Sequence, residues 1–179
     1  MKRIALVALS VVLAFSMVFS LTGCFGGDEK VIRDGISDQL NQFKNTNSDI
    51  WKKDMKSSLD SLSSMGIDAQ QLVAAWTEGF DYKIGTITID GNKATAELTI
   101  TCKQINPAID SAQLKYKSDA TNNSLSDSER AKKIGELIIS ELKAQTLTTT
   151  SITVEFTKSG NTWTESFGAM DEYSRALVG

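Results

Sequence analysis

The sequence predicts an α+β fold in which N-terminal helices pack on a four-stranded, curved antiparallel sheet. Three observations indicate this fold. Apolar residues recur at helical spacing from residue 28 to residue 79. The period then changes to two in two separate segments, each interrupted by a glycine-containing turn, so that each segment predicts a β-hairpin. Further helical patterns lie between the hairpins. Grouped helices followed by antiparallel hairpins are typical of α+β domains.

The N-terminal region predicts three helices. Residues 45–49 separate the first from the second. Gly66 suits a left-handed cap at the end of the second helix, and Asp68 suits the N-cap of the third, which Gly79 ends. Trp51 and Trp76 lie on the apolar faces of their helices, so we expect them in the core. The three apolar faces consist of Ile32, Ile36, Leu40 and Phe43; Trp51, Met55, Leu59 and Leu62; and Leu72, Val73 and Trp76.

The first predicted hairpin is DYKIGTITIDGNKATAELTITC, with Gly91 supplying a positive φ angle in its turn. Its second strand alternates cleanly and ends in Cys102, which we expect to be a buried, unreactive thiol. Its first strand changes parity at Gly85, where a β-bulge would restore the register. The second hairpin is ITVEFTKSGNTWTESF, in which Trp163 and Phe167 are expected on one face.

The segment between the hairpins predicts two helices and a polar loop. Pro107 suits the first turn of a helix over 107–117. Ser126 and Glu129 have the spacing of a capping box and begin a helix that extends to about Gln145. A last short helix is expected over 169–178.

The chain opens MKRIALVALSVVLAFSMVFSLTGC, which has the features of a secretory signal: Lys2 and Arg3, then an uncharged apolar stretch, then small residues. LTGC fits the bacterial lipobox, in which the cysteine thiol receives a diacylglyceryl group before cleavage. We therefore predict a signal peptide over 1–23, a lipidated short tether over 24–30 and a single α+β domain over 31–179. The alternative is an uncleaved transmembrane helix, because the apolar stretch of ~18 residues is just long enough to span a bilayer.

Either interpretation places the domain on the extracytoplasmic face of the cell membrane. Lipid on Cys24 would provide the membrane attachment, and two acyl chains suffice for stable anchoring. The six residues FGGDEK reach at most ~20 Å, so the domain should stay close to the membrane.

Composition excludes several classes of function. The predicted signal peptide contains two of the 19 basic residues and no acidic residue, which leaves the remainder with a net charge of −5. Nucleic acid is therefore not an expected partner. The chain has no histidine, which removes the commonest metal ligand and the usual proton shuttle. Without a catalytic motif, a phosphate-binding loop or a metal-ligand pattern, we expect no enzyme, no cofactor and no metal.

Two features of the predicted sheet bear on function. Glu165 alternates with Trp163 and Phe167, so its carboxylate would face an apolar cavity, where a raised pKa suits a general base. The alternative is a strand-edge charge that turns back to water. Threonines also crowd the hairpins and form a polar face that either binds a polysaccharide or partner or, as we favour, simply meets water. They are Thr86, Thr88, Thr95, Thr99, Thr101, Thr153, Thr157 and Thr164.

The order YKIGTITIDGNKATAELTIT, a helix, and ITVEFTKSGNTWTESF resembles small bacterial lipoproteins that carry domains of unknown function of the nuclear transport factor 2-like or cystatin-like type. The resemblance covers residues ~30–170. It implies a curved sheet wrapped on helices with a crevice between them. The candidate lining residues of that crevice are Trp76, Tyr82, Trp163 and Glu165.

These observations lead to three functional hypotheses. The first is a non-enzymatic lipoprotein that binds a small apolar ligand or a protein partner at the cell envelope. The second is a purely protein-interacting accessory subunit of an envelope complex. The third is an enzyme that uses Glu165 as its general base. An internal cavity would favour the first, and a solid core with exposed apolar surface the second.

Overall fold

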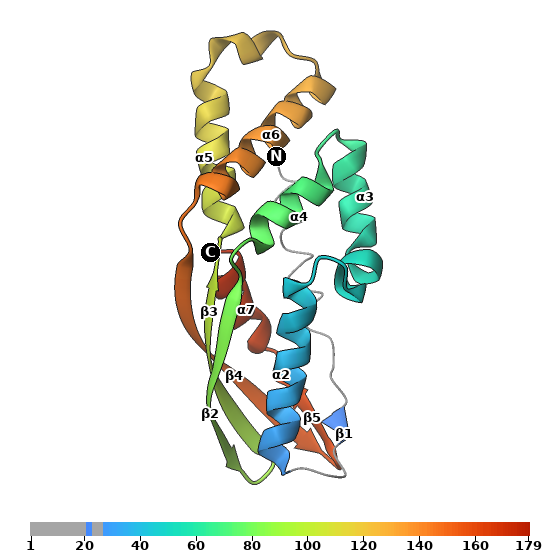
Figure 1. Ribbon diagram of the computed structural model, residues 1–179, viewed down its shortest axis with the longest axis vertical. Helices are drawn as coiled ribbons and strands as arrows, with labels where there is room; N and C mark the ends of the chain where they lie inside the picture. The colour runs from blue at the N-terminus through green and yellow to red at the C-terminus, as the bar shows by residue number, and fades with distance from the viewer. Residues whose placement is uncertain (1–20, 23–26) are drawn as a thin grey trace.

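The computed structural model describes residues 21–22 and 27–179 and confirms the α+β fold (Figure 1). Its antiparallel sheet has the strand order β1-β5-β4-β3-β2. The two predicted hairpins are β2–β3 and β4–β5, and the pairing of β3 with β4 joins them. The short β1, which pairs with β5, was not expected from the sequence. The strands are β1 (Leu21–Thr22), β2 (Asp81–Asp90), β3 (Lys93–Cys102), β4 (Thr148–Ser159) and β5 (Thr162–Glu165).

The helices lie close to their predicted positions. The first one begins at Asp28, so the last three residues of the predicted tether are already helical. The polar loop before the capping box contains one 3₁₀ turn, Ala120–Ser124. The helices are α2 (Asp28–Lys44), α3 (Lys56–Ser64), α4 (Ala69–Thr77), α5 (Ile105–Ser118), α6 (Asp127–Ala144) and α7 (Ala169–Leu177), with a π-helical segment, Ile50–Asp54, between α2 and α3.

The sequence features that predicted these helix starts and the first hairpin turn are confirmed. The Asp68 carboxylate accepts a hydrogen bond from the Gln71 backbone N–H and so caps α4. Ser126 and Glu129 form the reciprocal capping box that begins α6. Gly91 has a φ of +60° in the first hairpin turn, a conformation that side chains with a Cβ rarely adopt.

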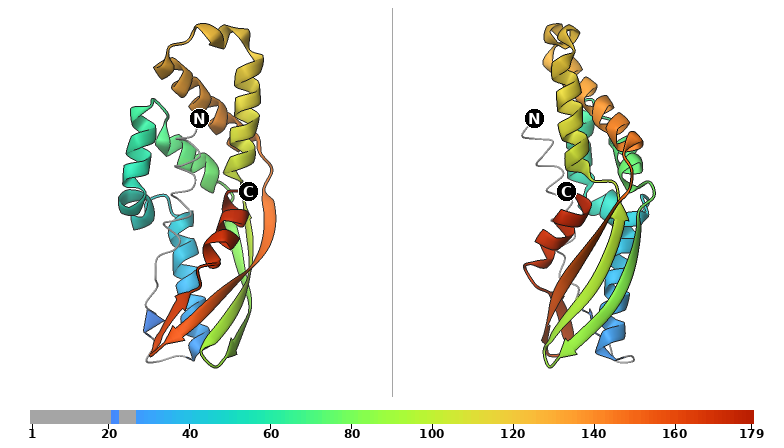
Figure 2. Two further views of the ribbon diagram at one scale, coloured as in Figure 1. Left: turned by 180° about the vertical axis from the view of Figure 1, so that it is seen from behind. Right: turned by 90° about the vertical axis from the view of Figure 1, so that its left-hand side faces the viewer.

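The sheet buries one face and exposes the other. On β3, residues 94, 96, 98, 100 and 102 are buried, whereas Thr95 and Glu97 are exposed. Helices α2 and α7 cover the buried face, α2 along β2 and α7 along β4 (Figure 2). Cys102 lies in this interface, where its thiol contacts the Ala176 carbonyl of α7. The prediction of a buried cysteine is therefore confirmed.

The molecule is long, with the sheet and α2 at one end and a pair of helices at the other (Figure 1). Residues 105–144, which comprise α5, the 3₁₀ turn and α6, form a helical hairpin that extends beyond the sheet; we call it the arm. The opposite end, which we call the turn end, consists of the start of α2 (residues 28–29) and the two hairpin turns (residues 90–93 and 159–161). Lys158 joins these parts, because its backbone N–H donates to the Asn92 carbonyl and its ammonium contacts Asp28.

The predicted β-bulge lies on β2, where the register with β3 shifts between Ile84 and Ile87. Gly85 sits in this shift, and a Cβ added to it would lie 3.3 Å from Glu97. Arg33 of α2 donates to the carbonyl oxygens of Ile84 and Gly85 at 3.2 Å and 3.1 Å. The bulge therefore directs two backbone carbonyls of the edge strand β2 toward the Arg33 side chain.

The prediction that Phe167 shares a face with Trp163 is wrong. Strand β5 ends at Glu165, and the Ser166 N–H bonds the Glu155 carbonyl as the chain leaves the sheet. The two-residue alternation of a strand no longer applies after that point. Phe167 is consequently 88% exposed, whereas Trp163 is buried.

Candidate functional site

The predicted lipidation site, Cys24, lies outside the described residues. Within 21–22 and 27–179, no helix combines the length and the apolar character needed to cross a membrane. Lipidation at Cys24 is therefore still a prediction. The structure bears instead on the predicted crevice and its four candidate lining residues.

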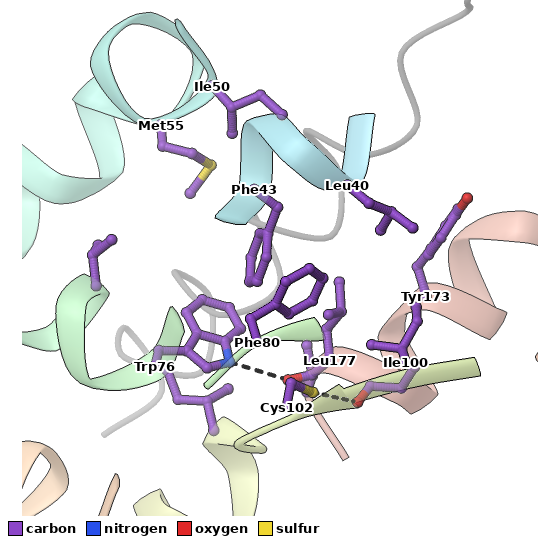
Figure 3. Packing of buried hydrophobic residues seen from close by; sticks show 14 of the residues in the cluster. Leu40, Phe43, Ile50, Met55, Trp76, Phe80, Ile100, Cys102, Tyr173 and Leu177 are labelled. Atoms are coloured by element: carbon purple, nitrogen blue, oxygen red, sulfur yellow. Dashed lines mark hydrogen bonds between the residues drawn. The ribbon is translucent and has the colours of Figure 1, made fainter. Parts of the chain in front are cut away.

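Trp76 belongs to an aromatic cluster that fills the space between the helices and the sheet (Figure 3). We define the aromatic cluster as Phe43, Trp51, Trp76 and Phe80. The Phe43 ring is its centre, with ring centroids 5.3 Å from Trp51, 5.5 Å from Trp76 and 4.9 Å from Phe80. Such spacings are those of aromatic pairs in direct contact. The four rings therefore pack against one another in the core, and Trp51 also lines a surface hollow between α3 and α4.

The polar atoms of this cluster are also engaged. The Trp76 indole N–H donates to the Leu177 carbonyl of α7 at 3.2 Å, and that of Trp51 donates to the Phe43 carbonyl at 2.9 Å. Buried indoles normally require such partners. The core prediction for Trp51 and Trp76 is confirmed, because both are at most 3% exposed.

Tyr82 lies beside the cluster, with its ring 6.3 Å from Phe80. Its hydroxyl contacts the Ser37 hydroxyl at 2.8 Å and donates to the Asn41 side-chain oxygen at 3.0 Å. These contacts hold strand β2 against α2. Tyr82 is half-buried, and its role is to join strand β2 to helix α2.

Trp163 lies on β5, two residues after the second hairpin turn. Its ring is buried beneath the Lys158 ammonium, which is 5.4 Å from the ring centroid. Lys158 also contacts both carboxylate oxygens of Asp28 at 2.7 Å. The Lys158 bond is the main cause that holds the pKa of Asp28 below its ordinary value. Within the described chain, the indole N–H has no acceptor at hydrogen-bonding geometry.

Glu165, at the end of β5, is partly buried and contacts α7 through Tyr173. The Tyr173 hydroxyl of α7 lies 3.2 Å from Glu165 Oε1 and 3.5 Å from the side-chain oxygen of Gln39 on α2. Tyr173 and Gln39 are at most 1% exposed. Burial raises the pKa of Glu165 to about 7, and the Tyr173 bond offsets part of this rise. The Glu165 carboxyl is partly buried, and its hydroxyl partner Tyr173 also contacts Gln39. A role for Glu165 as a general base stays a prediction.

Burial and the Tyr173 bond act in opposite directions on the polar group Glu165–Tyr173–Gln39. A tyrosine hydroxyl has one proton and donates to one acceptor at a time. The Tyr173 hydroxyl can donate either to Glu165 Oε1 or to the Gln39 side-chain oxygen. Donation to Glu165 stabilises the carboxylate and so opposes the effect of burial on its pKa. Burial is the larger effect, and it favours a neutral Glu165.

The expected crevice lined by Trp76, Tyr82, Trp163 and Glu165 is not supported. Trp76 and Tyr82 meet through Phe80, whereas Trp163 and Glu165 lie at the β5 side of the sheet. Helices α2 and α7 fill the space that a curved sheet would otherwise enclose. None of the four residues lines the three largest described hollows.

Those three hollows are open and lie on the surface. One of about 500 Å³ lies between α4 and α6, with Asp68, Lys132 and Lys143 on its walls. A second, of about 560 Å³, crosses the exposed sheet face between Lys83 and Arg175. The third, also about 560 Å³, lies between α3 and α4. The first two are walled by charged groups of both signs, which does not suit an apolar small molecule.

The exposed sheet face contains the predicted threonines. Thr95, Thr153 and Thr157 are exposed, and the hydroxyls of Thr101 and Thr149 contact each other across β3 and β4 at 3.0 Å. This is the solvent-facing arrangement that we favoured. Among the described residues, no group of three or more acidic or cysteine side chains is placed to hold a metal ion.

Sequence patterns missed Gln39, Tyr173 and Lys103. Gln39 lies beside the apolar stripe of α2, and Tyr173 lies in a helix too short to give a clear pattern. The Lys103 side chain is 6% exposed and its ammonium is 2.5 Å from Glu78, whose side chain is 65% exposed. A lysine directly after a strand gives no sequence signal of burial.

Comparison with known proteins adds no assignment. No family model matches the chain, and the searches of curated proteins and of solved structures produced no match.

Proposed function

We propose that the protein is an extracytoplasmic lipoprotein, held at the cell membrane by acyl chains on Cys24, that acts without catalysis by binding a protein partner at the cell envelope. The lipobox LTGC and the apolar segment before it support the anchor. The filled interior supports the choice of partner. Because α2, α7 and the aromatic cluster occupy the space inside the sheet, contact is left to the outer surface.

The surface offers contact points for such a partner. Among residues 27–179, the large apolar side chains that are exposed lie at separate places: Ile89 on β2, Leu114 on α5, Leu147 before β4 and Phe167 before α7. Leu114 is 69% exposed on the arm. A small apolar ligand, the other occupant considered, would need a pocket that buries most of its surface. The hollow between α3 and α4, with Trp51, Leu59 and Val73 on its walls, is open to solvent.

Intact mass and membrane partitioning test the anchor. The full chain and Cys24→Ala are expressed in a bacterial host. The expected result is a chain that begins at a diacylated Cys24 and partitions with the membrane, and a variant that is neither cleaved nor acylated. An uncleaved chain that stays in the membrane in both forms would establish the transmembrane-helix alternative and refute the lipoprotein proposal.

Native mass spectrometry of the purified protein distinguishes the occupants. A protein-binding domain is expected to carry no small molecule beyond its acyl chains. A copurifying apolar compound at one per chain would overturn the protein-partner assignment and restore the ligand-binding alternative.

An enzymatic role for Glu165 is the second candidate, because its pKa of about 7 suits a general base. Against this role, the carboxyl faces Tyr173 and Gln39, and none of the three hollows reaches it. A catalytic base must be accessible to its substrate. The Glu165→Gln variant tests the enzyme hypothesis. If the variant binds the partner and supports the cell envelope as well as wild type does, the enzyme hypothesis is refuted.

A further inference from the structure

We propose that the turn end is a membrane-contacting surface that rests on lipid headgroups, so that the domain stands upright and presents the arm away from the bilayer. This inference rests on the proposed lipidation of Cys24. It adds which surface meets the membrane and which surface is left for a partner. The turn end consists of residues 28–29, 90–93 and 159–161.

The position of Cys24 in the chain carries the inference. On its C-terminal side, α2 begins at Asp28, and four residue steps span at most ~14 Å. Asp28 is fixed to the turn end by Lys158, which contacts both of its carboxylate oxygens. On its N-terminal side, Thr22 pairs with Thr162, the residue that follows the second hairpin turn. Both flanks of Cys24 are thus joined to the turn end.

The α2 side of this connection remains after cleavage. Removal of residues 1–23 would release β1 from β5, but it leaves Asp28, Lys158 and α2 in place. Lys158 also holds the two hairpin turns together, since its N–H donates to the Asn92 carbonyl at 2.8 Å. An acyl chain on Cys24 therefore pulls both turns toward the same membrane surface.

The chemistry of the turn end suits headgroups. Both turns are short, polar and exposed, with the sequences Asp90-Gly91-Asn92-Lys93 and Ser159-Gly160-Asn161. The charged residues of the turn end are Asp28, Glu29, Asp90 and Lys93, so the surface is net acidic and has no attraction to anionic lipid by itself. Ile89, next to the first turn, is 37% exposed. We therefore expect shallow contact that depends on the acyl chains.

The arm lies at the far end of the molecule (Figures 1 and 2). Strand β3 rises from the turn end over 10 residues and α5 continues over 14. At roughly 3.3 Å per strand residue and 1.5 Å per helical residue, the tip of the arm stands roughly 50 Å from the turns. This is several times the Debye length of about 8 Å. The arm, with the exposed Leu114, is thus free of the lipid surface and its charge.

Site-specific quenching tests this orientation. A single cysteine is introduced at the turn end by Asn92→Cys or Asn161→Cys, or at the arm by Ala120→Cys, in the full-length chain processed by a bacterial host. Cys24 is consumed by the lipid and Cys102 is buried, so only the new thiol takes a fluorescent maleimide. The protein is reconstituted in phosphatidylethanolamine–phosphatidylglycerol vesicles with a short-range quencher on the lipid headgroups.

We expect the labels at positions 92 and 161 to lose most of their fluorescence, and the label at 120 to keep its vesicle-free value. The same labelled proteins in vesicles without the quencher are expected to keep their full fluorescence. Equal quenching at all three positions would mean that the domain lies flat, and stronger quenching at 120 would mean that it is inverted; either result overturns the inference. Intact mass separates this failure from the other, because an unacylated Cys24 would refute the proposed function itself.

Discussion

The hydroxyl of Tyr173 lies 3.2 Å from Glu165 Oε1, and this contact joins α7 to the end of β5 inside the domain. One partner ionises at a pKa of about 7, and the pKa of the other is raised well above its ordinary value. Burial is the main cause in both cases. A charged carboxylate here lacks the solvation of water. Several measurable properties of the domain should therefore depend on this pair.

Stability should fall as the pH rises through the interval from about 4.5 to about 7. The folded pKa of Glu165 is raised from 4.5 to about 7, so the folded state holds a proton that the unfolded chain has released. Stability decreases with pH wherever the folded state binds more protons. The difference corresponds to a loss of roughly 3 kcal/mol above neutral pH. Urea unfolding at pH 5, 6, 7 and 8 measures it.

Glu165→Gln should flatten this dependence and make the domain more stable than wild type at pH 8. Glu155→Gln is the matched control, because Glu155 is exposed on the other face of the adjacent strand. It should leave the slope unchanged. The same slope in wild type and Glu165→Gln would show that Glu165 is not the responsible group.

Tyr173→Phe should raise the pKa of Glu165 further, because the Tyr173 bond lowers it in the native protein. The pH at which stability declines should move upward. The lost hydrogen bond should lower the free energy of unfolding by about 1 kcal/mol at pH 5. Tyr116→Phe provides a control on the arm, where the hydroxyl bonds the Asn122 carbonyl. A pH midpoint that moves in Tyr116→Phe would contradict the local explanation.

Phe43→Ala should destabilise the domain by about 3–5 kcal/mol, since it removes the central ring of the aromatic cluster. Phe167→Ala is the matched control. Its side chain is 88% exposed, so stability should stay within about 0.5 kcal/mol of wild type. Thermal and chemical unfolding measure both. A comparable loss in the two variants would mean that Phe167 packs in the native protein.

Gly135→Ala should destabilise the domain although alanine is the better helix former. An added Cβ would lie 2.7 Å from Ile67 Cγ1 and 2.9 Å from its Cγ2, so α6 must move away from the segment before α4. Overpacking of this kind costs about 1–3 kcal/mol. The double variant Gly135→Ala/Ile67→Ala should recover part of the loss relative to the sum of the single changes. Additivity of the two effects would exclude the steric explanation.

Cys102 should resist thiol reagents in the folded protein. Its side chain is fully buried, and burial raises the pKa of the thiol to about 11, which leaves almost no thiolate at neutral pH. Chromogenic disulfide titration should detect it only in urea. Rapid reaction in native buffer would show that α7 separates from the sheet.

Local sequence patterns predicted most of the fold because they encode local physics. Asp68, Ser126 and Glu129 each satisfy backbone groups within three residues, and Gly85 marks the bulge through a change of parity on one strand. The candidate site depended instead on contacts between distant segments. Tyr173 and Gln39 are 134 residues apart, and no periodicity reveals their contact.

The crevice and the placement of Phe167 both depended on features that sequence patterns do not encode. The family resemblance implied a crevice inside a curved sheet, but sequence patterns give neither the direction of α7 nor the depth to which α2 inserts. Phe167 was assigned to a strand that ends two residues earlier, where the Ser166–Glu155 bond turns the chain. Sequence alternation cannot show where pairing with a neighbouring strand stops.

Arg33 occupies the carbonyls of Ile84 and Gly85 on the outer strand β2. An anchor of the kind proposed would confine many copies to two dimensions, all upright and side by side, at a high local concentration. Under those conditions an unblocked strand edge would recruit the edge of a neighbour and begin a continuous sheet. A guanidinium across the kinked edge hinders that pairing. Arg33→Ala would then matter little to a dilute domain in solution and far more to a crowded layer of them.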